Sequence, residues 1–314
     1  MSYHWAIVGL GTVAEEFATA ITQANLPIYA VQSRSQEKGE AFAKRFQIPK
    51  VYSSYQELLE DPTIDIIYLA TPHAFHYQMV KEALQYQKHV FCEKAITVDA
   101  KELAELIEIS KENQCLLAEG TTIFYMPLYQ KLKEYQPQFG KLKMVQANFG
   151  SFKEDKEENR FFSPKDAGGA LLDIGPYAFG ICQYFMTSSP KVFASTVEYH
   201  PSGVDESSCT ILKNDHEELA SINLTFRAKM PKRAIVAFEK GYLTIDDYPR
   251  ATSATFTTPD GTNYLIETKD TTHAFVHEYQ TMNHWLEQGI VSSPFISNVL
   301  QIMQLFDACR QQWK

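Results

Sequence analysis

Short apolar runs alternate with amphipathic stretches from residue 3 to about residue 119, and this alternation constrains the fold more than any other feature of the chain. The runs predicted as strands are His4–Val8, Ile28–Gln32, Ile64–Ala70, His89–Cys92 and Cys115–Ala118. The stretches with helical spacing are Val13–Ala24, Gln36–Phe46, Phe75–Gln85 and Ala100–Asn113. Repeated strand-helix-strand units with right-handed crossovers predict an α/β fold: a doubly wound parallel sheet with helices on both faces.

The pattern changes after about residue 120, where longer strand-like runs follow one another across turns. These runs are Met144–Phe149, Val192–Tyr199, Ser208–Leu212, Leu219–Phe226, Arg233–Phe238 and Tyr242–Ile245. Helices are predicted at Met126–Tyr135, Gly169–Phe185, Phe275–Glu287 and Ser297–Gln312. We therefore predict a first domain over 1–120 and an α+β domain over 121–314, with a large, mostly antiparallel, open sheet. The last helix of the second domain is able to pack back on the first.

Composition and charge exclude several classes of protein. A net charge of −9 offers no general basic surface for nucleic acid or an anionic membrane. No segment approaches roughly 18 consecutive apolar residues, and the first residues lack the basic and apolar regions of an export signal. The five cysteines are far apart, odd in number and without a metal-like pair, which indicates a reducing compartment. We expect a cytoplasmic protein whose partner is a small molecule.

A glycine-rich turn, Gly9–Ala14, follows the first predicted strand and opens the first predicted helix. It has the G-x-G-x-x-A form of the dinucleotide fingerprint. Gly9 allows the tight turn, and Gly11 lets the backbone approach a pyrophosphate that faces the helix N-terminus. In this context the turn favours a Rossmann dinucleotide-binding domain over an ordinary strand-helix turn. The residues predicted to contact the cofactor here are Gly9, Gly11, Thr12 and Val13.

The second strand ends in Ser33-Arg34-Ser35, where an acidic residue often binds the adenosine ribose hydroxyls. A carboxylate at this point would repel a 2′-phosphate, whereas Arg34 with Ser33 and Ser35 can hold one by charge-assisted hydrogen bonds. The sequence therefore favours NADP over NAD. The alternative is that Arg34 stacks on adenine and does not discriminate between the two cofactors.

The fourth strand runs into Ala70–His76 and the fifth into Glu93-Lys94. Ligands of open α/β sheets lie outside the carboxyl ends of the strands, so both loops should flank a nicotinamide. The residues predicted to line the cofactor are Thr71, Pro72, His73, His76, Glu93 and Lys94. Lys94 can also hydrogen-bond a substrate oxygen and stabilise alkoxide character as hydride moves. The two histidines are spaced like a metal pair, but no third ligand is evident, and we predict no metal.

A second candidate group lies in Gly168–Tyr177, where Asp173 and Tyr177 are four residues apart and share one helix face. A phenol with an ordinary pKa near ~10 is a poor base at neutral pH, although a neighbouring ammonium favours its phenolate. Tyr177 is the candidate acid/base, and Asp173 would orient Tyr177 or Lys94 or bind a second substrate hydroxyl. The structural alternatives are a packed tyrosine and a carboxylate at a helix end.

At these residues the chain resembles the glucose-fructose oxidoreductase, inositol dehydrogenase and rhizopine-catabolism (Gfo/Idh/MocA) family of NAD(P)-dependent oxidoreductases. The resemblance spans nearly the whole chain, and Gly-Gly-Ala-Leu-Leu-Asp-Ile-Gly with Tyr177 is most similar to the dihydrodiol dehydrogenase and NADP-linked aldose dehydrogenase branch. It implies that Lys94 and Tyr177 are the catalytic pair. It also implies a homodimer or homotetramer joined through the open face of the second-domain sheet.

The chain departs from the family pattern at two points. The family usually continues Glu-Lys-Pro, whereas Ala95 follows Lys94 here, so no proline-specific cis bond or rigid turn is expected after the lysine. Thr122 and Phe124 stand where branch members tend to carry tryptophan and arginine, which weakens the case for an aromatic diol substrate.

Together these features predict hydride transfer between a nicotinamide and a secondary alcohol or carbonyl of a sugar, polyol or cyclic diol. Two alternatives remain open. One is a reductase of a non-sugar carbonyl or imine, which would work mainly in the reducing direction. The other is a regulator that binds NAD(P) without chemistry, as the substitutions at Ala95 and 120–127 would allow.

Overall fold

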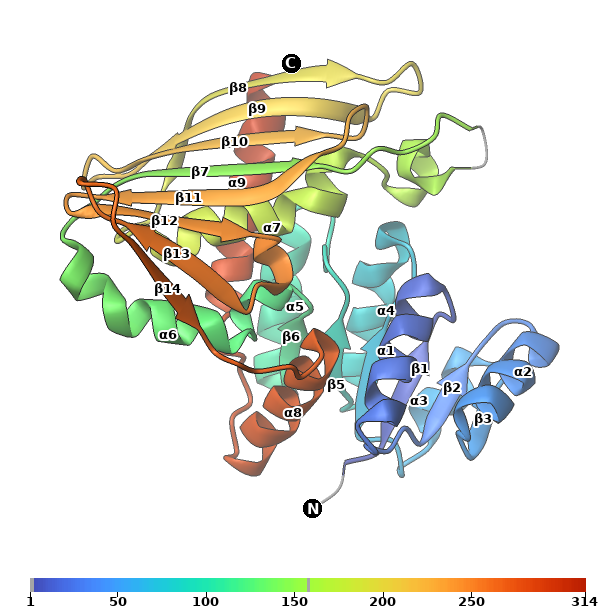
Figure 1. Ribbon diagram of the computed structural model, residues 1–314. Coiled ribbons are helices and arrows are strands. Elements are labelled where there is room, and N and C mark those ends of the chain that lie inside the picture. Colours follow the sequence, from blue (N-terminus) through green and yellow to red (C-terminus); the bar gives the residue numbers. More distant parts are fainter. Residues whose placement is uncertain (1–2, 157–158) are drawn as a thin grey trace. The chain divides into compact units, whose positions relative to one another are not determined.

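The computed structural model describes residues 3–156 and 159–314, which divide into two compact units. The first unit combines the chain up to Gly120 with Thr272–Ser297. The second combines Thr121–Thr271 with Asn298–Lys314. Figure 1 labels the elements of both units, which are described separately below.

The first unit contains a six-stranded sheet in the order β3-β2-β1-β4-β5-β6, in which every neighbouring pair is parallel. Its strands are β1 (Trp5–Val8), β2 (Ala30–Gln32), β3 (Lys50–Tyr52), β4 (Ile66–Leu69), β5 (His89–Cys92) and β6 (Leu117–Glu119). Its helices are α1 (Thr12–Gln23), α2 (Gln36–Phe46), α3 (Tyr55–Glu60), α4 (His73–Gln85), α5 (Ala100–Glu112) and α8 (Ala274–Glu287). The central strands β1 and β4 are buried along their whole length, as expected of a sheet covered on both faces. The predicted doubly wound sheet is confirmed.

Helix α8 completes the core of the first unit, although the sequence placed its residues in the second domain. The indole Nε1 of Trp5 donates to the Asn283 side-chain oxygen at 2.9 Å, and its rings stack on Tyr279 with centroids 4.5 Å apart. The Tyr279 hydroxyl donates to the Pro27 carbonyl at 2.9 Å. Trp5 is fully buried, so a helix from late in the sequence shields the start of the chain from water.

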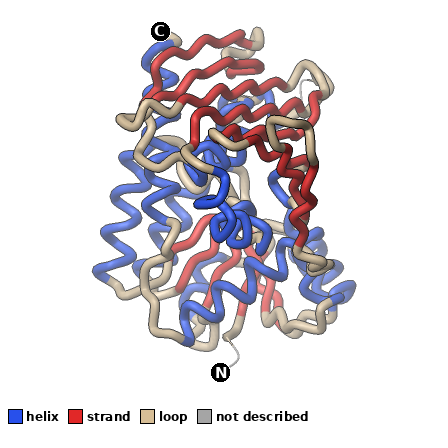
Figure 2. Tube along the Cα trace, turned by 60° about the vertical axis from the view of Figure 1, so that its left-hand side comes forward, coloured by secondary structure: helices blue, strands red, loops and turns tan. Residues whose placement is uncertain are grey.

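The second unit contains an eight-stranded sheet in the order β14-β13-β12-β11-β7-β10-β9-β8. Its strands are β7 (Leu142–Gly150), β8 (Lys191–Tyr199), β9 (Asp205–Lys213), β10 (Leu219–Thr225), β11 (Met230–Phe238), β12 (Gly241–Asp246), β13 (Ser253–Thr257) and β14 (Asn263–Glu267). Among the described strands of this second sheet, only β7 and β10 pair in parallel, which confirms the mostly antiparallel prediction. Figure 2 shows this sheet as one curved layer of strands.

One face of this sheet is covered and the other carries no helix in the described part of the chain. The helices of the unit are α6 (Pro127–Tyr135), α7 (Ala170–Phe185) and α9 (Ile296–Gln312), and they lie on the same face (Figure 1). The alternation of burial along β7 follows from this, because Val145, Ala147 and Phe149 are buried while Met144 is exposed. Within residues 3–156 and 159–314, no helix has the length and hydropathy needed to span a bilayer.

Candidate active site

The turn between β1 and α1 has the geometry that its glycines predicted. Gly9 has a φ of +88°, and a Cβ atom there would lie 2.8 Å from the carbonyl oxygen of Ala70 and from Cγ2 of Thr71. Only glycine fits this approach of two loops, because a side chain would clash with fixed backbone. The β1 turn and the loop after β4 are therefore neighbours at the carboxyl edge of the sheet.

The first turn of α1 is open toward solvent and fits a bound phosphate group. Gly11 precedes the helix with no side-chain cap, and a Cβ atom built on it would meet nothing within 4 Å. Thr12 is exposed and Val13 is half-buried at the start of the helix. Backbone N–H groups at a helix start attract anions, so this cradle of residues 9–13 suits the pyrophosphate of a dinucleotide.

Ser33 and Arg34 follow β2 directly, at the same edge of the sheet. Arg34 is exposed and forms no ion pair with any residue that the structure describes. The Ser35 side chain caps α2 by accepting from the Lys38 N–H at 3.3 Å. The loop thus offers a guanidinium group and the start of a second helix, which fits the 2′-phosphate predicted for this position.

Lys94 follows β5, and the two histidines of α4 hold the backbone around it. The ring of His73 contacts the Lys94 carbonyl through Nε2 at 3.1 Å. The ring of His76 contacts two carbonyl oxygens, that of Ala95 through Nδ1 at 2.8 Å and that of Thr71 through Nε2 at 2.7 Å. Both partners of His76 are acceptors, so both contacts are hydrogen bonds when each ring nitrogen carries a proton. The histidines therefore tie the Lys94 loop to the loop after β4, and Pro72 stands between them as the N-cap of α4.

The peptide bond between Lys94 and Ala95 is cis, so the expectation that alanine removes a cis bond at this point is wrong. The next residue is held as well, because the Ile96 N–H donates to a Glu119 carboxylate oxygen at 2.9 Å. Glu93 is buried and accepts from the Tyr68 hydroxyl at 2.5 Å. Hydrogen bonds from α4 and β6 thus position the backbone from Lys94 to Ile96, and Tyr68 of β4 holds the Glu93 carboxylate. The Lys94 side chain is itself half-buried.

Helix α7 carries Asp173 and Tyr177 one turn apart, and it runs through Pro176. Asp173 is buried and Tyr177 is half-buried. The Tyr177 ring lies beside Phe149 at the end of β7, with centroids 6.0 Å apart. Phe149 also contacts Tyr248, whose fully buried ring lies at 6.3 Å. The tyrosine predicted as acid/base therefore lies in an aromatic cluster at the end of the covered sheet face.

The start of α7 is held by Asp205, a residue that no sequence signal singled out. The Leu171 N–H donates to Oδ2 of Asp205 at 2.6 Å. Gly169 precedes the helix with a φ of +118°, and a Cβ atom there would lie 2.2 Å from Oδ1 of the same carboxyl group. Burial raises the pKa of Asp205 to about 6, against the opposing effects of the Leu171 N–H and the Arg310 charge. A carboxyl group from β9 thus replaces the side-chain cap that Gly169 cannot supply.

Within the described residues no group of three or more histidine, cysteine or acidic side chains is arranged to hold a metal ion. Cys92, next to the candidate lysine loop, is fully buried, and burial together with Glu119 and Glu93 raises the pKa of its thiol.

Comparison with known proteins matches a family model to each half of the chain. A family model described as "Oxidoreductase family, NAD-binding Rossmann fold" matches residues 3–121, and one described as "GFO/IDH/MocA C-terminal domain" matches residues 130–244. A trans-1,2-dihydrobenzene-1,2-diol dehydrogenase from Xenopus tropicalis is 32% identical over 251 residues, which cover 78% of this chain and 76% of the relative. The chain belongs to the GFO/IDH/MocA family. The resemblance described from the sequence is confirmed.

Two further proteins are similar to this chain, one in sequence and one in fold. A D-xylose 1-dehydrogenase (NADP(+)) from Haloferax volcanii is 27% identical over 285 residues, covering 89% of this chain and 87% of the relative. A 3-ketoreductase from Actinomadura kijaniata, solved in complex with NADP and TDP-benzene, superposes with a TM-score of 0.90 at 19% identity and covers 100% of this chain and 98% of its own. This structural likeness supports the two-domain fold alone.

Proposed function

We propose that this protein is an NAD(P)-dependent oxidoreductase that transfers hydride between its cofactor and a secondary alcohol or carbonyl group of a sugar, polyol or cyclic diol. The observation that carries the proposal is the fixed backbone around Lys94, at the same sheet edge as the glycine turn of residues 9–13. A regulator that only binds a nucleotide has no use for a positioned lysine. Family membership and the named dehydrogenases among the relatives support the same class of reaction.

The cofactor that we propose is NADP in preference to NAD. The N-terminus of α1 would hold the pyrophosphate, and Ser33 and Arg34 would hold the 2′-phosphate. The residues that we propose to line the nicotinamide end are Thr71, Pro72, His73, His76, Glu93 and Lys94. When bound, the cofactor supplies or accepts a hydride at nicotinamide C4.

Three side chains are proposed to act on the substrate. The Lys94 ammonium group would donate a hydrogen bond to the reacting oxygen and stabilise negative charge there. Tyr177 would exchange the proton of that oxygen through its hydroxyl. Asp173, buried one turn earlier on α7, would orient Tyr177 or accept a hydrogen bond from a second substrate hydroxyl.

The test is a screen of NADPH formation and consumption across aldoses, polyols and cyclic diols, with NAD in parallel. Lys94→Met and Tyr177→Phe should each lower kcat by about 100-fold or more, the range in which a positioned proton-transfer group acts. Both variants should keep cofactor affinity within about threefold, measured by NADPH fluorescence. Near-normal turnover in both variants would refute the catalytic roles. Cofactor binding without turnover of any substrate would favour a regulator.

We further propose a cytoplasmic homodimer or homotetramer joined through the sheet face that carries no helix. That face exposes the large apolar side chains of Met144, Ile211 and Tyr242 on three different strands. An exposed apolar group of this kind is typical of an interface. Four of the five cysteines are buried and all are free, which suits a reducing compartment.

A further inference from the structure

Lys232 lies near the start of β11, on the face of the sheet that the helices cover. The residues that follow alternate, so Ala234, Val236 and Phe238 are buried while Arg233 faces the other way. Lys232 is on the same side as the buried set, yet it remains exposed, because it stands at the end of the strand. A charged side chain on the core face of a strand end borders the protein interior rather than the open surface of the sheet.

A β-bulge aims Lys232 at the aromatic cluster beside Tyr177. The pairing of β11 with β7 shifts between Met230 and Arg233, so Pro231 and Lys232 together stand opposite Phe149. The Lys232 ammonium nitrogen lies over the Phe149 ring, 5.0 Å from its centroid. The same ring neighbours Tyr177. The ammonium group and the proposed acid/base therefore border a common aromatic side chain.

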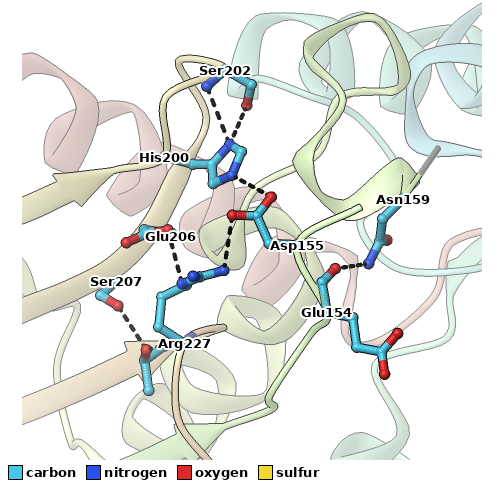
Figure 3. A network of polar contacts seen from close by, with 9 residues as sticks. Glu154, Asp155, Asn159, His200, Ser202, Glu206, Ser207 and Arg227 are labelled. Atoms are coloured by element: carbon cyan, nitrogen blue, oxygen red, sulfur yellow. Dashed lines mark hydrogen bonds and ion pairs between the residues drawn. The ribbon is translucent and has the colours of Figure 1, made fainter. Parts of the chain in front are cut away.

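Lys232 differs from the arginines of the same segment in having no carboxylate partner. Arg227 is held between Asp155 and Glu206, at 3.6 and 3.4 Å (Figure 3). Arg233 pairs with Asp246 through two bonds, of 2.6 and 3.2 Å. Lys232 forms no ion pair or hydrogen bond with any described residue, and its ammonium group lies over the Phe149 ring. The Lys232 ammonium group can therefore pair with an anionic ligand, whereas Arg227 and Arg233 are already paired with carboxylates of the protein.

We propose that Lys232 is a specificity-determining residue that selects substrates carrying an anionic oxygen group, a carboxylate or a phosphate, on the carbon skeleton. This inference rests on the proposed function, since the ligand is the substrate of that reaction. A chain with a net charge of −9 repels anions at long range, so recognition of an anion requires a local cation. An ammonium over an aromatic edge supplies a charge for the anion and an apolar surface for the sugar ring.

The test compares matched sugars that differ only at carbon 6: D-glucose, D-glucuronate and D-glucose 6-phosphate, with the galactose and mannose series alongside. We measure kcat/KM with NADP for the wild type and for Lys232→Met, Lys232→Arg and Arg233→Met. The last variant is the matched control, because it removes one charge from the neighbouring position on the opposite face. Comparing kcat/KM for D-glucuronate with that for D-glucose 6-phosphate shows whether the site prefers a carboxylate or a phosphate.

The wild type should prefer an anionic sugar over its neutral counterpart by about 10-fold or more. Lys232→Met should abolish that preference mainly through KM and leave the neutral sugar within about threefold. Lys232→Arg should retain much of it, and Arg233→Met should leave it unchanged. An unaltered preference in Lys232→Met, or an equal loss in Arg233→Met, would overturn the inference.

A binding measurement separates this inference from the proposed function. The same sugars are titrated calorimetrically into the NADP-loaded wild type and variants. Absence of turnover with every sugar would count against the proposed activity on sugars, whereas anion binding that is lost only in Lys232→Met would still support the anionic site. Equal binding of neutral and anionic sugars by the wild type would overturn the site even if the enzyme is active.

Discussion

The carboxyl group of Asp205 offers a sharp test of how α7 is anchored. It accepts a hydrogen bond from the first turn of the helix that carries Asp173 and Tyr177, and it is only 9% exposed. Burial raises its pKa from 3.8 to about 6, which means that the folded protein holds this proton more tightly than the unfolded chain does. The perturbation that we choose is Asp205→Asn, which keeps an oxygen acceptor for the Leu171 N–H and cannot ionise.

The magnitude follows from linkage. Because the folded-state pKa is raised, the stabilising contribution of the proton is complete below pH ~4 and is lost as pH rises through about 6. At about 1.4 kcal/mol per pKa unit, the whole effect is about 3 kcal/mol. Of this stabilising contribution, the wild type loses about 1.3 kcal/mol as pH rises from 5 to 7. The free energy of unfolding of Asp205→Asn minus that of the wild type should therefore increase by this amount as pH rises from 5 to 7.

The assay is urea unfolding of both proteins at half-unit steps of pH, followed by circular dichroism. Subtracting the free energies of unfolding of the two proteins at each pH cancels the contributions of the titrating groups that both proteins share. The control is Asp215→Asn, an exposed carboxylate paired with Lys191 at 3.5 Å, which should give a small difference that does not follow this pH course. A flat difference for Asp205→Asn would refute the reasoning. A difference of opposite sign would mean that the helix N-terminus and Arg310 outweigh burial.

Two further predictions concern the cofactor and the open sheet face. Arg34→Gln should raise the KM for NADP by about 10-fold and leave that for NAD within about twofold, measured by steady-state kinetics; an equal effect on both cofactors would assign Arg34 to adenine stacking. Ile211→Glu should dissociate the oligomer, seen by light scattering, because it buries a charge in an apolar interface. Dissociation should also speed thiol labelling of the exposed Cys209, whereas a monomeric wild type would already label fast.

The parts of the fold that could be predicted are those encoded by local periodicity. The turn of Gly9–Ala14 and the cap of α5 depend on neighbouring residues alone, since the Glu102 N–H donates to Asp99 at 2.9 Å, three residues away. Elements with little periodicity were missed. Strand β3 has three residues and α3 has six, while β13 and β14 have five residues each, too few for a clear period.

The parts of the candidate site that could not be predicted depend on long-range pairing. Asp205 meets the start of α7 from a position 34 residues later in the chain. Lys232 reaches Phe149 because of a bulge that only the pairing of β11 with β7 reveals. Glu119 and the histidines of α4 bind backbone carbonyl and N–H groups around Lys94. These contacts could not be predicted, because the spacing of side chains in the sequence does not indicate which backbone groups they will meet.

The return of α8 to the first unit has a consequence for the order in which the protein can fold during synthesis. A ribosome makes chains from the N-terminus, and N-terminal domains commonly fold first. Here the partners of Trp5 include Tyr279 and Asn283, which are made only after all eight strands of the second unit's sheet. The unit that begins the chain therefore cannot finish its core until almost the last residues emerge. A fragment ending at Gly120 would leave that apolar surface exposed and prone to aggregation.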